Sequence, residues 1–232
     1  MAPLNPISTW NERGIEEIKK PLSKFYFLCE GSKTERYYFE ALFEYLNKRN
    51  TAMRVLPLYV ERTEEDETVS CLIRLAEYAS EIRADEEKKY GFNDQLDKTV
   101  LIFDADIYKN RSKEFKELLE NVSADNIIGV TQPSIELFLL LHRENAYKQY
   151  IAPKKEELFE NKKVSNRRRF VDKYFSECYG VNPKTNSAVA GLAEDYLLAI
   201  QEEKQLNKDV SKAAEQLTSN IGEIIELLQV GV

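Results

Sequence analysis

The chain has 232 residues, of which 43% are hydrophobic and 31% charged, and its formal net charge is −7. This composition supports one large domain, or one domain with an appendage, around a buried core, and it argues against disorder. The negative charge argues against a protein that coats nucleic acid in general, but it leaves nucleases open, because catalytic carboxylates themselves lower the net charge.

Membrane spans, disulfides and histidine-based sites are not expected. No apolar run approaches the length of a bilayer span, and the N-terminus lacks the apolar core of a signal peptide, so we expect a cytoplasmic protein. Three widely spaced cysteines indicate reduced thiols. His142 is the only histidine, which excludes multi-histidine metal sites and leaves little room for Ser-His-Asp chemistry.

The first predicted strand carries an acid at its tip. After an irregular arm over residues 1–21, the apolar run Phe25 to Leu28 predicts a buried strand that ends at Glu30. A turn then leads into a helix that Ser32 caps, with Glu35 completing an S-x-x-E capping box. Ligands bind at the carboxyl ends of strands in open α/β sheets, so an acid at this tip is not accounted for by packing.

A later strand ends in the same way, because the apolar run 99–103 leads directly into Asp104-Ala105-Asp106. Residues i and i+2 of an extended chain point to the same side, so we expect Asp104 and Asp106 to converge. Carboxylates from two strand tips repel each other unless a cation lies between them, and Mg²⁺ prefers such oxygen ligands. The sequence therefore predicts a divalent-metal site at one edge of a parallel sheet.

Other strands and helices alternate along the first part of the chain. Their predicted ranges are a helix over 33–48, a strand over 54–60, helices over 68–90 and 112–121, a strand over 126–131, and a helix that starts at Pro133-Ser134 with Glu136 in its first turn. This alternation predicts an α/β fold with a mostly parallel sheet flanked by helices.

The pattern changes after Glu144, where no convincing strand remains. We expect helices only, including a long one over 187–203 and a last one capped by Thr218-Ser219-Asn220. The expected organisation is an arm over 1–21, a catalytic domain over 22–145 and a helical C-terminal region over 146–232 packed on it.

Basic residues gather between Lys154 and Lys173, where Arg167, Arg168 and Arg169 are consecutive. Such a run is usually a solvated face, but beside an acidic metal site it becomes a candidate surface for nucleic-acid phosphates. Lys184 is a candidate cation for the transition state. No G-x-x-x-x-G-K pattern is present, so we do not expect ATP binding by this chain.

Three sequence blocks together resemble the RloB-like family of the Toprim superfamily. The blocks are Glu30-Gly31-Ser32-Lys33-Thr34-Glu35 with Tyr38-Phe39, then Asp104-Ala105-Asp106, then Pro133-Ser134-Ile135-Glu136-Leu137-Phe138-Leu139-Leu140-Leu141-His142. They occur in the order expected for the family. Two positions differ, because Arg36 stands where the family pattern has proline and Arg143 where an aromatic residue is common.

The resemblance implies a Toprim-like (Rossmann-like) fold with Mg²⁺ as cofactor, for which Mn²⁺ can substitute. Glu30, Asp104 and Asp106 match the invariant acids of Toprim domains, and Glu35 and Glu136 match additional acids of the nuclease branch. RloB-like proteins are usually regarded as effector nucleases of bacterial anti-phage defence (abortive infection), often encoded beside an ABC- or OLD-type ATPase.

The favoured hypothesis is a Mg²⁺-dependent endonuclease that cleaves DNA or RNA, with tRNA among its candidate substrates. Asp104 and Asp106 would hold one ion, Glu30 would hold metal or act as general acid/base, and Glu35 and Glu136 would complete a second site. Glu35 is explained equally well as a capping residue, and Glu136 could simply complement a helix dipole.

Two other functions stay open at this stage. One is nucleotidyl transfer of the primase or topoisomerase type, and the other is a non-catalytic or regulatory subunit of an ATPase. Intact acids at all five positions argue against the non-catalytic alternative. The sequence leaves a homodimer open.

Overall fold

The computed structural model describes residues 23–30, 33–49, 53–60, 71–85, 89–165, 168–185 and 187–230. Its centre is a five-stranded sheet with the strand order β2-β1-β3-β4-β7, in which only the β4–β7 pair is antiparallel. The strands of this sheet are β1 (Ser23–Glu30), β2 (Met53–Val60), β3 (Lys98–Asp104), β4 (Ile127–Gln132) and β7 (Thr218–Ser219). The predicted α/β class with a mostly parallel sheet is confirmed.

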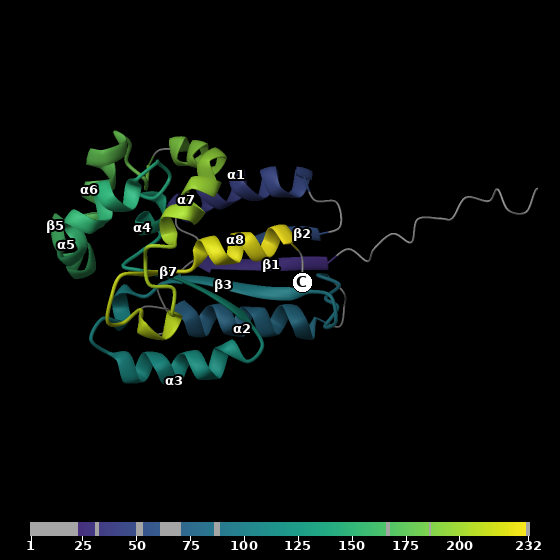
Figure 1. Cartoon of the computed structure of the whole chain (residues 1–232). Coiled ribbons are helices and arrows are strands. Elements are labelled where there is room, and N and C mark those ends of the chain that lie inside the picture. Colours follow the sequence, from purple (N-terminus) through teal and green to yellow (C-terminus); the bar gives the residue numbers. More distant parts are fainter. Residues whose placement is uncertain are drawn as a thin grey trace, which may run out of the picture.

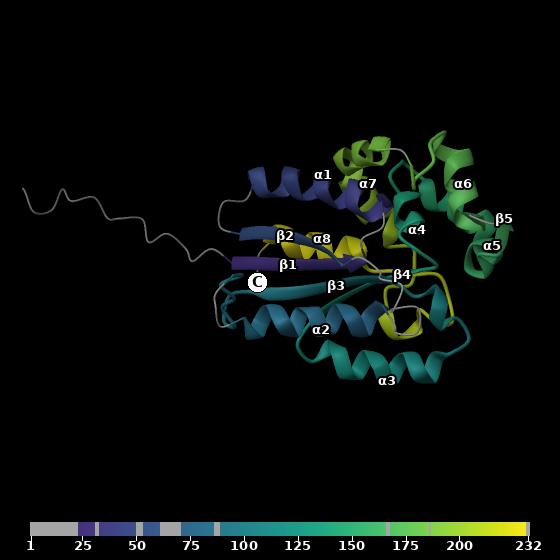
Figure 2. The ribbon, with the colours of Figure 1, turned by 180° about the vertical axis from the view of Figure 1, so that it is seen from behind.

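Helices cover both faces of the sheet (Figures 1 and 2). The α-helices are α1 (Lys33–Arg49), α2 (Cys71–Ala84), α3 (Ser112–Ser123), α4 (Glu136–Leu139), α5 (Lys155–Glu160), α6 (Phe170–Tyr179), α7 (Tyr196–Glu203) and α8 (Ile221–Val230). Helices α1, α7 and α8 lie on one face and α2 and α3 on the other, while α4, α5 and α6 gather at one end. This end is where β1, β3 and β4 finish.

Alternating side chains in the central strands build two cores. Phe25 and Phe27 of β1 point into the core under α1, α7 and α8, whereas Tyr26 and Leu28 point into the core under α2 and α3. All four are at most 1% exposed, because β1 is an inner strand of a sheet that helices cover on both sides. This explains why the strand is one continuous apolar run in the sequence.

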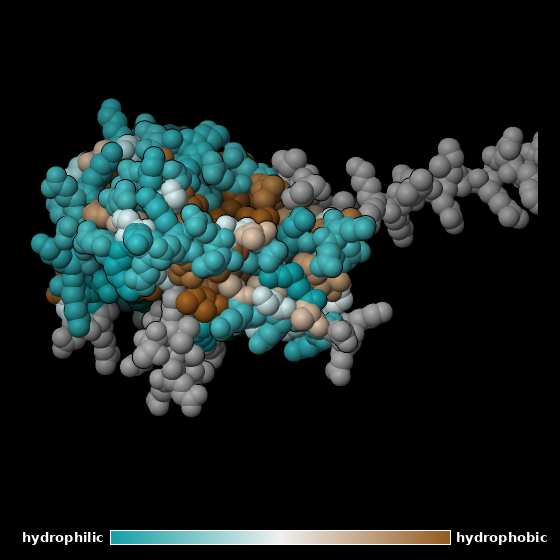
Figure 3. Space-filling view, turned by 90° about the horizontal axis from the view of Figure 1, so that it is seen from below, coloured by the Kyte–Doolittle hydropathy of each residue, from teal (hydrophilic) through white to brown (hydrophobic). Residues whose placement is uncertain are grey.

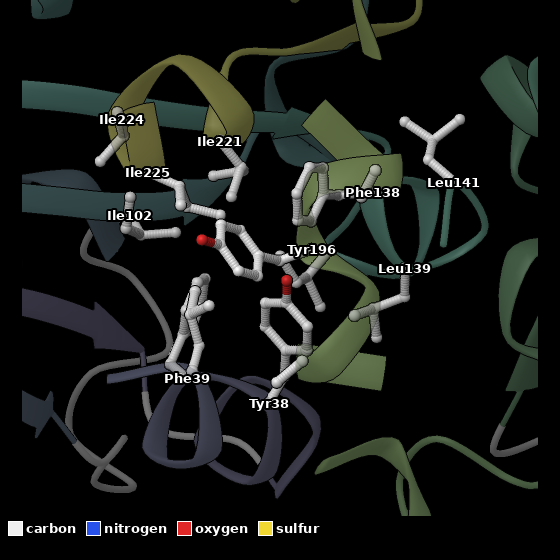
Figure 4. Packing of buried hydrophobic residues seen from close by; sticks show 14 of the residues in the cluster. Tyr38, Phe39, Ile102, Phe138, Leu139, Leu141, Tyr196, Ile221, Ile224 and Ile225 are labelled. Atoms are coloured by element: carbon white, nitrogen blue, oxygen red, sulfur yellow. The ribbon is translucent and has the colours of Figure 1, made fainter. Parts of the chain in front are cut away.

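The larger core joins segments that are far apart in the chain (Figure 4). Tyr38 of α1 packs edge-on against Phe138 of α4, with ring centroids 6.0 Å apart, and Tyr196 of α7 and Ile225 of α8 belong to the same cluster. His142 lies in it too, and its Nε2 and the Tyr38 hydroxyl are 2.8 Å apart. Burial lowers the pKa of His142 to about 4, so this imidazole is a neutral core residue.

Gly129 allows α8 to pack closely against β4. A Cβ atom at this position would lie 2.1 Å from Cδ1 of Ile102 and 2.6 Å from Cδ1 of Ile224, both far inside contact distance. A glycine in the middle of a strand usually weakens the strand. Here the close approach of α8 explains why position 129 is a glycine.

The C-terminal region differs from the prediction of helices alone. In its described part it adds the edge strand β7 to the main sheet, and β5 (Lys163–Ser165) and β6 (Arg168–Arg169) form a second, two-stranded sheet. These strands have two or three residues each, too few for a periodic signal in the sequence. They show that the C-terminal region is part of the α/β architecture and not only a helical addition to it.

Three predicted helices also have different lengths in the described residues. The helix expected over 187–203 is a 3₁₀ segment, η6 (Ser187–Asp195), followed by α7. The helix that begins after Pro133-Ser134 has only four α-helical residues, and α2 ends at Ala84, short of the expected residue 90. Remaining short helical turns are η3 (Asp106–Tyr108), η4 (Tyr147–Ile151, a π-helix), η5 (Ala152–Lys154) and η7 (Val210–Lys212).

The surface is mainly hydrophilic on the face shown in Figure 3, with hydrophobic side chains gathered in small patches. Among the described residues, the exposed large apolar side chains come from different elements and are Ile73, Ile107, Val164 and Leu197. Such scattered residues are normal for a protein surface. Within the described residues, no helix combines the length and the apolar character that crossing a bilayer needs.

Candidate functional site

A small polar cavity of about 120 Å³ lies at the carboxyl ends of the central strands, where α4 and α6 meet the sheet. Most of its lining residues are charged or polar, and they come from both halves of the chain. The lining residues are Glu35, Asp104, Asp106, Ser134, Glu136, Asn161, Arg169, Val171, Asp172 and Lys184.

Asp104 is the last residue of β3 and lies opposite Thr131 of β4 in the parallel register. The Thr131 hydroxyl donates a hydrogen bond of 2.7 Å to Oδ1 of Asp104, which fixes the carboxylate at the strand tip. Burial raises the pKa of Asp104 well above its usual range, and the charges of Glu35, Glu136 and Asp106 raise it further. The carboxylate is thus held where its negative charge is unfavourable.

Asp106 reaches the same cavity through a turn and not through a strand. We expected Asp104 and Asp106 to converge as alternate residues of an extended chain, but Ala105 has φ −91° and ψ 8°, and Asp106 begins the 3₁₀ turn η3. Its Oδ2 lies 3.4 Å from Nη1 of Arg169, the residue that ends β6. A guanidinium group from the C-terminal region therefore already stands beside one of the predicted metal ligands.

Glu136 is 3% exposed, at the start of α4. The Ser134 hydroxyl donates a 2.6 Å hydrogen bond to its Oε2, and the Thr34 hydroxyl of α1 lies 3.5 Å from its Oε1. Burial raises the pKa of Glu136, as does the charge of Asp172, while Ser134 and Lys184 lower it. A residue that only complements a helix dipole can stay on the surface. Glu136 is instead buried and accepts a strong hydrogen bond, so the helix dipole alone does not explain its position.

Two glutamates come from the first strand and helix. Glu35, in the first turn of α1, lines the cavity, and its charge raises the pKa of Asp104. The backbone of Glu30 ends β1, one residue past the Cys29–Ile102 pair with β3. This position places the Glu30 backbone beside the end of β3, but its side chain and the predicted cap Ser32 lie outside the described residues.

Lys184 approaches the acids from the segment after α6. Its Nζ lies 2.9 Å from Oδ1 and 3.0 Å from Oδ2 of Asp172, a carboxylate that is itself almost fully buried. Although burial lowers it, the pKa of Lys184 is raised by the hydrogen bond to Asp172 and by the charges of Glu136 and Asp172. Lys184 is therefore a firmly charged cation at the cavity wall.

Comparison with known proteins identifies the family of the chain. A family model described as RloB-like protein matches residues 25–228, which is most of the chain. The chain belongs to the RloB-like family. No curated protein matches it, and no solved structure matches it either.

The match spans both halves of this RloB-like chain, and so does the cavity. The structure brings Glu35, Asp104, Asp106 and Glu136 together with Lys184, and of the three consecutive arginines only Arg169 lines the cavity in the described residues. Arg168 is half-buried in β6 and is not a lining residue, and Arg167 lies outside the described residues.

Asp172 and Asn161 line the cavity but were missed in the sequence. Asp172 is 2% exposed, and its Oδ2 accepts a hydrogen bond from the backbone N–H of Arg169, as a capping residue of α6 does. The spacing from Arg169 to Asp172 is that of a capping box, so the sequence could have suggested a helix start there. Nothing in the sequence indicated that this start faces the acids.

The chemistry of the lining suits a hard divalent cation, since carboxylate oxygens predominate and their mutual repulsion raises the pKa of Asp104. As they stand, no three acid, cysteine or histidine side chains among the described residues converge closely enough to enclose an ion. Arg169 pairs with Asp106 and Lys184 with Asp172 instead. The carboxylates of the cavity thus fit a metal ion chemically. In the structure, two protein cations neutralise part of their negative charge.

Proposed function

We propose that this protein is a divalent-metal-dependent nuclease that hydrolyses phosphodiester bonds of DNA or RNA. The observation that carries the proposal is one cavity in which the predicted acids, from three separate parts of the chain, meet two cations from a fourth. Packing and helix capping do not explain why all of these acids share one polar cavity. Perturbed carboxyls grouped in a cleft are typical of functional sites.

In this proposal the acids hold Mg²⁺, or Mn²⁺ in its place. Asp104, Asp106 and Glu35 would be the ligands, with Glu136 and Glu30 as further candidates. A bound divalent ion supplies neutralisation of phosphate charge and an activated water. Thr131 orients Asp104 through its 2.7 Å hydrogen bond, and Ser134 orients Glu136 in the same way.

The cations of the C-terminal region complete the proposed chemistry. Arg169 and Lys184 would bind non-bridging oxygens of the substrate phosphate and stabilise the charge that develops on the leaving oxygen. Arg169 can leave Asp106 without a large cost, because its side chain is 54% exposed and exposed ion pairs contribute little. Lys184 is the better candidate for the transition-state cation, since Asp172 holds it in place.

The Toprim resemblance supports the same activity and adds a biological role. We infer that the protein is an effector of bacterial anti-phage defence that acts in the cytoplasm with an ABC- or OLD-type ATPase encoded alongside. Release of such a nuclease from its partner would be toxic to the cell.

The proposal is tested by cleavage assays on a panel of plasmid DNA, single-stranded DNA and total tRNA with Mg²⁺ or Mn²⁺. We expect cleavage of at least one substrate by the wild-type protein, none with EDTA, and none by Asp104→Asn. Asp94→Asn is the matched control, because Asp94 is an exposed acid that lines a different cavity. Equal cleavage by Asp104→Asn and the wild type would exclude a catalytic role of this cavity.

A non-catalytic subunit is the second candidate, and the ion pair between Asp106 and Arg169 favours it. In this alternative the cations replace the metal permanently and the cavity is a structural charge cluster. Mn²⁺ binding separates the two functions, because a structural cluster would show no difference between the wild type and Asp104→Asn.

A further inference from the structure

Asn161 has a hydrogen-bond donor that the protein leaves unused. The residue is 3% exposed and lines the acidic cavity, and its Nδ2 is buried with no hydrogen-bond partner among the described residues. A buried donor without a partner costs about 1–3 kcal/mol, so most such groups in proteins are paired. An unpaired amide at the wall of a polar cavity points to a ligand that pairs with it.

The orientation of the amide is fixed by its other atom. Oδ1 of Asn161 accepts a 3.1 Å hydrogen bond from the backbone N–H of Val171, in the first turn of α6. This bond assigns the oxygen to the helix and leaves the NH₂ group as the free end. Since an NH₂ group only donates hydrogen bonds, its partner has to be an acceptor, and a metal ion is ruled out as that partner.

The backbone conformation explains only in part why position 161 is an asparagine. Asn161 has φ 44° and ψ 44° at the C-terminal end of α5, a left-handed conformation that asparagine and glycine adopt readily. Glycine would satisfy the backbone equally well. Only asparagine or aspartate also supplies the acceptor for Val171, and only asparagine adds a donor.

The neighbouring groups identify the class of acceptor. Arg169 and Lys184 line the same cavity as Asn161, together with the carboxylates of Asp104 and Glu136. Two cations and a free amide in one cavity form a set of donors suited to a tetrahedral anion with several oxygens. A phosphate group of the substrate provides such oxygens.

We propose that Asn161 donates a hydrogen bond from Nδ2 to a non-bridging oxygen of the substrate phosphate, next to Arg169 and Lys184. This inference rests on the proposed nuclease function and adds a residue that is outside the family blocks and is not one of the basic residues between Lys154 and Lys173. It also gives α5, which has no other role at the cavity, a reason to end where it does.

The test is oligonucleotide binding in the presence of Ca²⁺, used in place of Mg²⁺ so that binding is measured separately from cleavage. Short fluorescein-labelled single-stranded DNA and RNA of the same sequence are titrated with the full chain and followed by fluorescence anisotropy. We expect Asn161→Gly to bind about tenfold more weakly or worse, the effect of losing a hydrogen bond to a charged group. Asn161→Asp should bind more weakly still, because its carboxylate repels the phosphate.

Two variants keep the experiment interpretable. Asn161→Asp retains the acceptor for Val171 and tolerates the left-handed conformation, so it tests the donor if Asn161→Gly does not fold. Asn145→Gly is the matched control, because Asn145 is an exposed asparagine with φ 58° that is not a lining residue of the cavity. It should bind both oligonucleotides like the wild type, and thermal unfolding checks that each variant is folded.

The outcomes separate this inference from the function on which it rests. Wild-type protein that binds neither oligonucleotide overturns the nuclease proposal and this inference with it. Wild-type binding that Asn161→Gly and Asn161→Asp retain in full overturns the inference alone, and Nδ2 then holds only a buried water.

Discussion

At the scale of single residues, Asp104 shows that an acid of the site can lower the stability of the protein. Its carboxylate accepts one hydrogen bond, from Thr131, while the charges of Glu35, Glu136 and Asp106 act against it. An acid whose pKa is raised by folding contributes stability at low pH that is lost as the pH rises above its unfolded value of about 3.9. At neutral pH, Asp104 therefore destabilises the metal-free protein.

Asp104→Asn should accordingly stabilise the protein in EDTA near pH 7.5, by at least about 1 kcal/mol. The amide keeps an oxygen for the Thr131 hydroxyl and removes the repulsion by the neighbouring acids. Urea denaturation of both proteins with EDTA and with Mn²⁺ measures this. Mn²⁺ should raise the midpoint of the wild type only, and a variant less stable than the wild type in EDTA would contradict the expectation.

Glu203 is a second acid with a raised pKa. It lies away from the cavity, so we expect it to affect the stability of the protein and not the proposed activity. Burial is the main cause that raises its pKa to about 7, although Ser219 and the backbone N–H of Gly222 both donate to it. Gly222 is required at this close approach, because a Cβ atom there would lie 2.4 Å from Oε2 of Glu203. The carboxyl therefore joins the end of α7 to the start of α8.

Glu203→Gln should remove a pH dependence of folding. The stability contributed by Glu203 is full below about pH 4.5 and is lost as the pH rises through about 7, because the folded state holds the proton more tightly. Glutamine can keep both hydrogen bonds, since the Ser219 hydroxyl can accept from the new NH₂ group. The variant should be more stable than the wild type at pH 8, by about 3 kcal/mol at most. Parallel unfolding profiles from pH 5 to pH 8 would contradict this assignment.

The acids at the strand tips could be predicted from the sequence, but the residues that position these acids could not. Asp104 and Glu136 follow or begin regular apolar runs, and that makes them visible. Thr131 and Asp172 are polar residues inside ordinary elements, and their roles depend on which strand or helix lies opposite. Such pairings over long sequence distances carry no local signal.

At the scale of elements, the start of α6 joins the C-terminal region to the acidic cavity. Asp172 of α6 holds Lys184, and the backbone N–H of Arg169 donates to the same carboxylate. The Asp172 side chain is 3% exposed, whereas that of Lys184 is 47% exposed. Loss of the lysine would leave a buried charge with fewer partners, which is costly.

Lys184→Ala should therefore lower the free energy of unfolding by about 1–2 kcal/mol, less than for a fully buried pair because the lysine is half exposed. Lys173→Ala is the matched control, since its pair with Glu177 is more than half exposed on both sides and should matter by less than about 0.5 kcal/mol. Adding Asp172→Asn to Lys184→Ala should recover part of the loss, as measured in a double-mutant cycle by urea denaturation. Additive effects would mean that the two side chains do not interact.

At the scale of the whole molecule, the order of strands and helices up to β4 could be predicted because each element is long and periodic. The edge strand β7 could not, since Thr218 and Ser219 alone have no periodicity. Its place is set by contacts between residues far apart in the chain, because Asn220 accepts from the backbone N–H of Val130 and donates to the carbonyl of Ile128. In the sequence, the same three residues have the pattern of a helix cap.

These contacts bear on the expected division into a domain over 22–145 and a helical region over 146–232. The core under α1 contains Tyr196 of α7 together with Ile221 and Ile225 of α8, and Gly129 of β4 is fitted to α8. A chain that stops at residue 145 would expose this apolar face and leave the β4 edge unpaired, which favours aggregation.

We therefore predict that a fragment of residues 22–145 does not fold by itself. It should bind the dye ANS and lack a cooperative unfolding transition, while the full chain shows one transition by near-ultraviolet circular dichroism. Mixing in a fragment of residues 146–232 should restore native signal in proportion to complex formed, because the missing face and edge strand are then supplied. A 22–145 fragment that unfolds cooperatively and leaves ANS unbound would instead establish that segment as an independent domain. The acids would then fold without Arg169 and Lys184, and the two halves of the cavity could be separated experimentally.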